Sequence, residues 1–187
     1  VKDLPDAIDF YKKHGDRSDL ARMIFFLGQT FYEQGQKEIA LDTYKKVIKL
    51  TPRQPEAYNA QVEIMLIYHE KKDFDTLWKR IEHVHKNYSE ESKWAKFNKK
   101  DFVKKSVKKT RELALYYPKK IHIAAQKFNK SSYYSAAFNG YKLYLKLYPK
   151  DIHRVMVLEY LGDIEYLKTN YFNASVYYKE IVSYGKK

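Results

Sequence analysis

Histidine and carboxylate side chains are the residues of this sequence best suited to catalysis or metal binding. His83 and His85 stand two residues apart, which places them on different sides of a helix and makes them a poor pair of metal ligands. Glu90 and Glu91 are typical of the first turn of a helix, where the helix dipole favours negative charge. Three further histidines are isolated in the sequence: His69, His122 and His153.

Motifs for the common reaction classes are missing. No glycine-rich phosphate loop, nucleophile elbow or HExxH pattern occurs. The sequence has no cysteine, which removes disulfides, thiolate zinc sites and cysteine nucleophiles. We therefore expect a protein that is not an enzyme, with no catalytic residue, no metal site, no cofactor and no small-molecule substrate.

The strongest charge feature is a basic segment, residues 93–111. Nine basic residues against one acid, Asp101, give it +8 of the chain's net charge of +13. Three aromatic residues, Trp94, Phe97 and Phe102, are interleaved with the charges. The basic residues are Lys93, Lys96, Lys99, Lys100, Lys104, Lys105, Lys108, Lys109 and Arg111.

Three interpretations of the basic segment are open. It is a solvated helix face that keeps the chain in solution. Alternatively, it contacts an acidic protein or an anionic membrane surface, where each clustered lysine contributes about 1 kcal/mol. In the third interpretation it binds nucleic acid, with an affinity that falls steeply with salt. Nucleic acid is the less favoured partner, because lysine far outnumbers arginine and no RRM or zinc-finger motif is present.

Composition indicates long helices rather than a membrane or disordered chain. The 187 residues are 44% hydrophobic and 32% charged, and no stretch reaches the roughly 18 to 20 apolar residues of a membrane span. Only 6 glycines and 5 prolines are present, so tight turns are few. The 19 tyrosines are expected to fill gaps between helices, with their hydroxyl groups reaching water or a neighbour.

A spacing of small and aromatic residues recurs along the chain. Gly28 precedes Ala40 by the same step as Gly162 precedes Ala174, and a tyrosine follows each alanine one helical turn later. A glycine inside a helix costs about 1 kcal/mol relative to alanine, a cost tolerated where a neighbouring helix must approach closely. A third copy retains the alanine, the tyrosine and a following proline: Ala137, Tyr141 and Pro149.

These residues resemble the tetratricopeptide-repeat consensus, a helix-turn-helix of about 34 residues with Leu-Gly, an aromatic, Gly, and then Ala-x3-aromatic and Pro. The resemblance implies an all-α fold, a right-handed α-solenoid of antiparallel helix pairs. Ala7 and Tyr11 are expected in a truncated first repeat, and a helix is expected to end at Tyr117-Pro118. The expected segments of this single domain are 1–20 (truncated repeat), 21–54 (repeat), 55–91 (degenerate repeat), 92–117 (inserted basic helical segment), 118–151 (repeat) and 155–187 (repeat).

The resemblance also implies a concave groove lined by the first helix of each pair. The first helix is expected to expose two aromatic residues there, and the last helix two acids. Phe25 and Gln29 stand where chaperone-binding members carry a Lys and an Asn, so a chaperone tail is not the expected ligand. The implied groove residues are Arg22, Phe25, Gln29, Tyr32, Asn59, Glu63, Lys119, His122, Gln126, Glu159, Asp163 and Tyr166.

The function we expect is that of a protein-protein interaction scaffold holding a peptide or helix of a partner protein. The Tyr148-Pro149 helix ending and the short spacer 151–154 resemble tetratricopeptide proteins of the bacterial cell envelope, including outer-membrane assembly and gliding-motility types. The resemblance therefore favours a larger bacterial multi-repeat protein, in the periplasm or cell envelope rather than the cytoplasm. A nucleic-acid-binding helical-repeat protein that uses residues 93–111 is the alternative.

Overall fold

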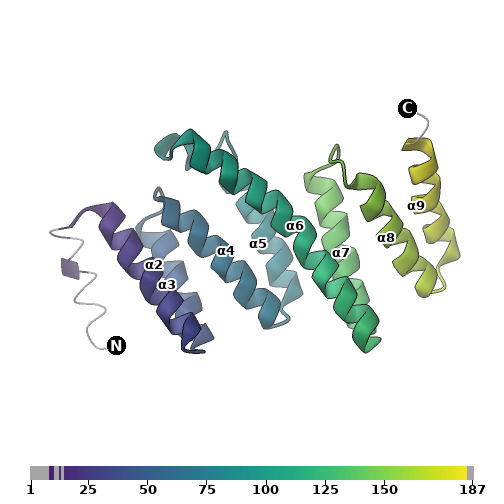
Figure 1. Cartoon of the computed structure of the whole chain (residues 1–187), viewed down its shortest axis with the longest axis horizontal. Coiled ribbons are helices and arrows are strands. Elements are labelled where there is room, and N and C mark those ends of the chain that lie inside the picture. The colour runs from purple at the N-terminus through teal and green to yellow at the C-terminus, as the bar shows by residue number, and fades with distance from the viewer. Residues whose placement is uncertain (1–8, 11–12, 14, 185–187) are drawn as a thin grey trace. The chain divides into compact units, whose positions relative to one another are not determined.

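The computed structural model describes residues 9–10, 13 and 15–184, and this part of the chain is helical without a strand. The predicted all-α class, built from helix pairs, is confirmed (Figure 1). Ala7 and Tyr11 of the expected truncated repeat lie outside the described residues. The elements are α2 (Arg17–Glu33), α3 (Lys37–Leu50), α4 (Pro55–Glu70), α5 (Phe74–Asn87), the 3-10 helix η1 (Ala95–Phe97), α6 (Lys100–Phe128), α7 (Ser131–Leu147), α8 (Arg154–Leu167) and α9 (Tyr171–Tyr184).

The chain divides into two compact units, with the boundary between Lys108 and Lys109 inside α6. In the first unit α2 packs on α3, α3 on α4, and α4 on α5, while the first helices α2 and α4 also touch each other (Figure 1). In the second unit α7 packs on α8, and α8 on α9. None of the described helices combines the length and the apolar character needed to cross a bilayer.

Two glycines allow a tyrosine ring of the following helix to lie against the helix backbone. A Cβ atom on Gly28 would stand 2.6 Å from Cε1 of Tyr44, and one on Gly162 would stand 2.5 Å from Cε1 of Tyr178. Both distances are shorter than Cβ atoms adopt in proteins, so only glycine fits without a shift of the ring. The close approach predicted at these two positions is confirmed.

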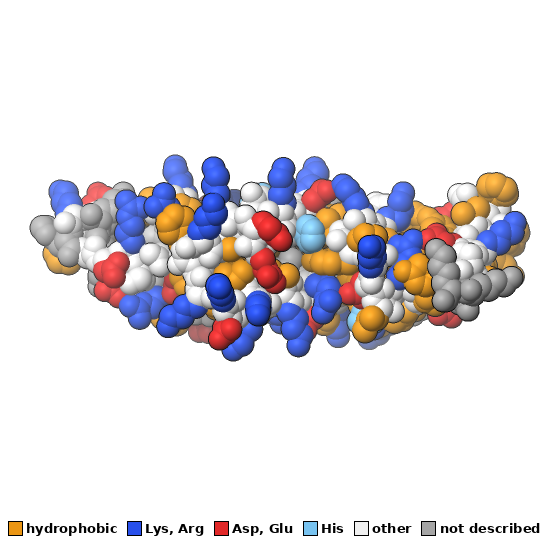
Figure 2. Space-filling view, turned by 90° about the horizontal axis from the view of Figure 1, so that it is seen from above, with side chains coloured by type: hydrophobic (Ala, Val, Ile, Leu, Met, Phe, Trp, Pro, Cys, Tyr) orange, Lys and Arg blue, Asp and Glu red, His pale blue; other side chains and the backbone are white. Residues whose placement is uncertain are grey.

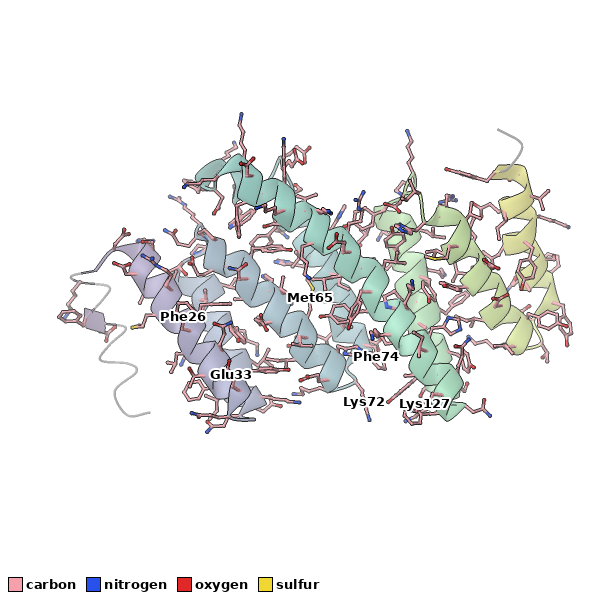
Figure 3. The ribbon with its side chains drawn as sticks, in the orientation of Figure 1. Phe26, Glu33, Met65, Lys72, Phe74 and Lys127 are labelled. Atoms are coloured by element: carbon pink, nitrogen blue, oxygen red, sulfur yellow. The ribbon has the colours of Figure 1, made fainter. Side chains whose placement is uncertain are left out.

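The described helix pairs α2–α3, α4–α5, α6–α7 and α8–α9 share one turn geometry. A residue one or two positions after the first helix has a left-handed backbone, and the N–H group of the residue that follows it donates to the carbonyl five residues earlier, at 2.8 to 3.1 Å. This is the Schellman arrangement, which satisfies the last carbonyl groups of a helix. Figure 3 shows Lys72 at the α4–α5 turn. The left-handed residues are Gly35 (φ 77°), Lys72 (62°), Asn129 (47°) and Thr169 (60°).

Helix α6 departs from the expectation. The predicted helix end at Tyr117-Pro118 is wrong, because α6 continues to Phe128 with Pro118 inside it. Proline has no N–H group, so a mid-helix proline costs about 3 kcal/mol. Tyr117 and Ile121, on either side of Pro118, are almost fully buried, and this burial offsets the local cost. The repeat boundaries and the right-handed sense of the solenoid stay predictions.

Candidate functional site

In the first unit, the expected groove residues differ in exposure. Arg22 is exposed, and Gln29, Asn59 and Glu63 are half-buried. Phe25 is buried, so the expectation that α2 exposes two aromatic side chains there is wrong for this residue. The centre of its ring lies 5.6 Å from that of Tyr44, within the core formed by α2, α3 and α4.

Tyr32, the other aromatic residue expected in the groove, is half-buried. Its hydroxyl donates to Oε1 of Glu70 at 2.7 Å, and Nζ of Lys37 lies 2.9 Å from the other oxygen of the same carboxylate. Burial and the hydrogen bond to Glu70 raise the pKa of Tyr32 to about 12. Burial likewise raises the pKa of Glu63. These two groove positions are therefore polar, and Tyr32 is bonded to Glu70, while Phe26 of the same helix is 62% exposed.

In the second unit, one of the expected groove residues is buried. His122 is 5% exposed, and the rings of Tyr134, Tyr141 and Tyr160 surround it at centroid distances of 5.6 to 5.8 Å. Its Nδ1 lies 3.3 Å from the hydroxyl oxygen of Tyr141, and its Nε2 has no hydrogen-bond partner. The other expected groove residues of this unit are accessible: Lys119 half-buried, and Gln126, Glu159, Asp163 and Tyr166 exposed.

His122 makes stability depend on pH. Burial lowers the pKa of His122, and the Asp163 carboxylate opposes this shift only in part. Below about pH 6.5 the unfolded chain takes up a proton at His122 that the folded chain resists, so the free energy of unfolding falls as the pH is lowered. Phe25 holds the matching position in the expected repeat 21–54. We expect His122→Phe to lose less stability than the wild type between pH 8 and pH 5, measured by urea denaturation.

Two further histidines also affect how stability depends on pH, and one of them provides the control variant. Burial lowers the pKa of His83 and of His85, which act on stability in the same direction as His122. His83→Gln is therefore expected to retain the part of the pH dependence that comes from His122. Identical pH dependence in the wild type and His122→Phe would contradict the assignment.

A hollow of about 520 Å³ lies on α6 in the second unit. The apolar side chains that α6 contributes to its lining are Leu115, Tyr116 and Ile123, called its floor below, and the last two are 48% and 58% exposed. Lys119 is the expected groove residue that lines it. The full lining is Arg111, Glu112, Leu115, Tyr116, Lys119, Lys120, Ile123, Tyr144 and His153.

Asp151 organises the rim of this hollow, a role the sequence analysis missed. Its side chain is 5% exposed, with Nδ1 of His153 at 2.8 Å and the Arg111 guanidinium at 3.4 Å. Burial raises the pKa of Asp151, but hydrogen bonds from His153 and Tyr144, with the charge of Arg111, outweigh that effect and lower it. The ionised carboxylate thus holds two rim side chains in place. An acid shortly after Pro149 was the available signal.

The basic segment of the sequence is solvent-exposed. All nine of its lysine and arginine side chains are exposed, and Lys and Arg side chains are more frequent than Asp and Glu on the face drawn in Figure 2. Two of its three aromatic residues do not share this surface. Trp94 is buried and packs with Phe102 on Tyr58 and Tyr88 in the first unit, at centroid distances of 5.1 to 6.3 Å.

Chemically, these arrangements offer binding surfaces. Within the described residues, no three His, Asp or Glu side chains gather in a way that holds a metal ion. The groups described above whose pKa is shifted are Tyr32, which is bonded to a carboxylate, three histidines and the carboxyls of Glu63 and Asp151, and burial contributes to each of these shifts. What is accessible is an apolar hollow with a cationic rim, and a surface of exposed lysines.

Residues 28–60 match the family model of the TPR repeat. This confirms the tetratricopeptide resemblance for the second half of α2, for α3 and for the start of α4. Tetratricopeptide arrays offer extended surfaces to protein partners, which supports an interaction scaffold in general terms.

Two solved structures are similar over most of their length. The MamA RS-1 ArsTM double mutant is 11% identical with a TM-score of 0.40, covering 99% of this chain and 94% of its own. MamA 41-end from Desulfovibrio magneticus RS-1 is 14% identical with a TM-score of 0.30, covering 92% and 97%. No curated protein sequence matches the chain.

Proposed function

We propose that the chain is a non-enzymatic scaffold that holds a peptide or helix of a partner protein on the accessible faces of its first helices. The observation that carries this proposal is the hollow of about 520 Å³ on α6. Its volume lies within the range of about 300 to 1,000 Å³ that is usual for ligand pockets. The half-buried Lys119, which the family resemblance assigns to the groove, lines it.

The chemistry of this hollow suits one large apolar side chain of a partner. Tyr116 and Ile123 present apolar surface to solvent, and covering such surface contributes about 25 cal/mol per Å². Nζ of Lys120 lies 5.4 Å from the centre of the Tyr116 ring, so the cation and the ring are held together. An amphipathic helix that inserts apolar anchors into such a groove is a recurrent mode of recognition.

Mutation of the floor tests this function. We expect Tyr116→Ala/Ile123→Ala to weaken binding of a captured partner at least about tenfold, because apolar anchors at the centre of an interface carry most of its affinity. Capture from lysate of the source cells, with nuclease added, identifies the partner, and titration of that purified partner gives the affinity.

The matched control is Ile152→Ala/Phe172→Ala, which removes two side chains that are 89% and 78% exposed and lie outside the hollow. This control is expected to bind as the wild type does. Equal affinity of the floor variant and the wild type would refute the assignment of the site. Phe25→Ala is unsuitable as a groove variant, because it would create a core cavity.

The proposal also covers the larger protein to which the chain belongs and its cellular compartment. The Tyr148-Pro149 ending and the spacer 151–154 support a place in a larger multi-repeat protein of the bacterial cell envelope. Fractionation of source cells with an antibody to this chain tests the compartment, and recovery in the cytoplasm alone would remove this part of the proposal. Nucleic-acid binding has less support, since Trp94 and Phe102 are not available to stack on bases.

A further inference from the structure

A second hollow lies in the first unit, away from the groove positions. Its volume is about 540 Å³, and it lies where α2 begins, beside the α3–α4 loop and η1. Two arginines contribute to the lining and no acid does. The lining residues are Arg17, Thr51, Pro52, Arg53, Gln54 and Phe97.

The segment around η1 is fastened to the α3–α4 loop by side chains. Nε1 of Trp94 donates to the carbonyl of Gln54 at 3.0 Å. Nδ2 of Asn98 donates to the carbonyls of Arg53 and Trp94, at 2.9 and 2.8 Å. The guanidinium of Arg53 lies 4.3 Å from the centre of the Phe97 ring. Arg53 and Phe97 are therefore held in place before any ligand arrives, which lowers the entropic cost of binding.

The arginines of this hollow are free to pair with an anion. Among the described side chains, no ion pair involves Arg17 or Arg53. Phe97 is 55% exposed. A guanidinium that rests on an aromatic ring keeps its N–H edge available, and that edge matches a carboxylate in a two-bond geometry.

The surrounding charge favours the same ligand. Lys96, which precedes Phe97 in the chain, and Lys100 are exposed and line another hollow of about 410 Å³ together with Lys104, against the one acid of that lining, Glu90. Lys99 is exposed between them. Such clustered cations attract an anionic chain and speed its encounter.

We propose that the hollow of Arg17, Arg53 and Phe97 docks an acidic segment of a partner protein, with glutamate or aspartate carboxylates on the two arginines. This inference deepens the proposed scaffold function and rests on it, but it concerns a different surface. A peptide fits better than a nucleic acid, because Arg53 covers one face of Phe97 and the two other aromatic residues of the basic segment pack in the unit's interior. Single-strand binders need several free aromatic faces.

The test uses the whole chain and a fluorescent peptide of eight residues with six glutamates, measured by anisotropy at about 0.1 M salt. The matched peptide has glutamine at the six positions. We expect the glutamate peptide to bind and the glutamine peptide to bind at least about tenfold more weakly. Arg17→Ala/Arg53→Ala is expected to weaken binding of the glutamate peptide at least about tenfold, with circular dichroism unchanged.

The matched control is Lys46→Ala/Lys49→Ala, which removes the same charge from exposed positions on α3. It is expected to change the affinity less than about threefold. An equal loss in both variants would mean diffuse attraction by net charge and would overturn the proposal. Absence of binding of the glutamate peptide would also overturn it. So would a single-stranded oligonucleotide, or phosphatidylserine vesicles, that bind more tightly than the glutamate peptide and lose as much affinity in the arginine variant as the peptide does.

The proposal for the α6 hollow and the proposal for the hollow of two arginines can be tested separately. Tyr116→Ala/Ile123→Ala is expected to bind the glutamate peptide as the wild type does, because neither side chain lies in the first unit. Suppose that Tyr116→Ala/Ile123→Ala binds its captured partner normally while the arginine variant loses the glutamate peptide. The assignment of the α6 hollow is then wrong, and the proposal for the hollow of two arginines stands. If the first variant loses its partner while the arginine variant still binds the glutamate peptide, only the proposal for the hollow of two arginines is overturned.

Discussion

Gly28→Ala is expected to lower the free energy of unfolding by up to about 2 kcal/mol, although alanine is the better helix former. The added methyl group would stand 2.6 Å from the Tyr44 ring, which is fully buried and has core side chains around it. Forcing extra volume into a packed core costs about 1 to 3 kcal/mol. The higher helix propensity of alanine stabilises the folded state by about 1 kcal/mol at most. Urea denaturation followed by circular dichroism measures the difference.

Two comparisons show whether the ring causes the loss. Gly162→Ala creates the same contact with Tyr178, but Tyr178 is only half-buried and can move, so a smaller loss is expected. In Gly28→Ala/Tyr44→Leu, the methyl group no longer meets the ring, so the cost of the alanine is expected to fall by about 1 kcal/mol or more. Glu33→Ala, at an exposed position (Glu33 is labelled in Figure 3), is expected to stay within about 0.5 kcal/mol of the wild type. A fully additive double variant would contradict the close-approach explanation.

Trp94→Ala is expected to lower the free energy of unfolding by about 3 to 5 kcal/mol, the usual cost of deleting a buried tryptophan. The ring is 5% exposed and lies 5.1 to 5.8 Å from the rings of Tyr58, Tyr88 and Phe102. Its loss also leaves the Gln54 carbonyl without the indole donor at 3.0 Å. The same denaturation experiment measures this change.

Trp94→Phe separates the ring from its hydrogen bond. Most of the aromatic packing remains, and the free energy of unfolding is expected to fall by about 1 kcal/mol, from the lost donor and part of the ring area. Because Trp94 fastens the η1 segment to the α3–α4 loop, the glutamate peptide should also bind more weakly to Trp94→Ala than to Trp94→Phe. Unchanged stability of Trp94→Ala would show that the basic segment does not depend on this aromatic packing.

The turns show how far local sequence carries a prediction. Gly35 is a recognisable helix stop, and its left-handed backbone agrees with that signal. Lys72 and Thr169 adopt the same left-handed conformation although they are not glycine. Neither residue type favours this conformation, and its steric cost is about 1 to 2 kcal/mol. Asn129 is the other residue type that tolerates this conformation. At Lys72 and Thr169 the packing of the two helices of a pair imposes the geometry, and residue type alone does not predict it.

The candidate sites were predicted less well than the helices. Lys119, Gln126, Glu159, Asp163 and Tyr166 are accessible, as a groove requires. The floor of the α6 hollow, the carboxylate behind its rim and the hollow of two arginines had no signal in repeat spacing. The rim and the hollow of two arginines depend on side chains from separate helices or loops, and spacing within one repeat does not reveal which of these meet.

The sequence by itself determined the helix pairs, because helical periodicity and the step from Gly28 to Ala40 to Tyr44 describe contacts within one pair of adjacent helices. Tertiary structure decided what is buried and where α6 ends. The contact between Trp94 and the carbonyl of Gln54 spans 40 residues, and the helix continues through Pro118 because its neighbours are buried on both sides. Such contacts between distant segments outweigh local preferences, since burial of a whole side chain is worth more than the propensity of one residue.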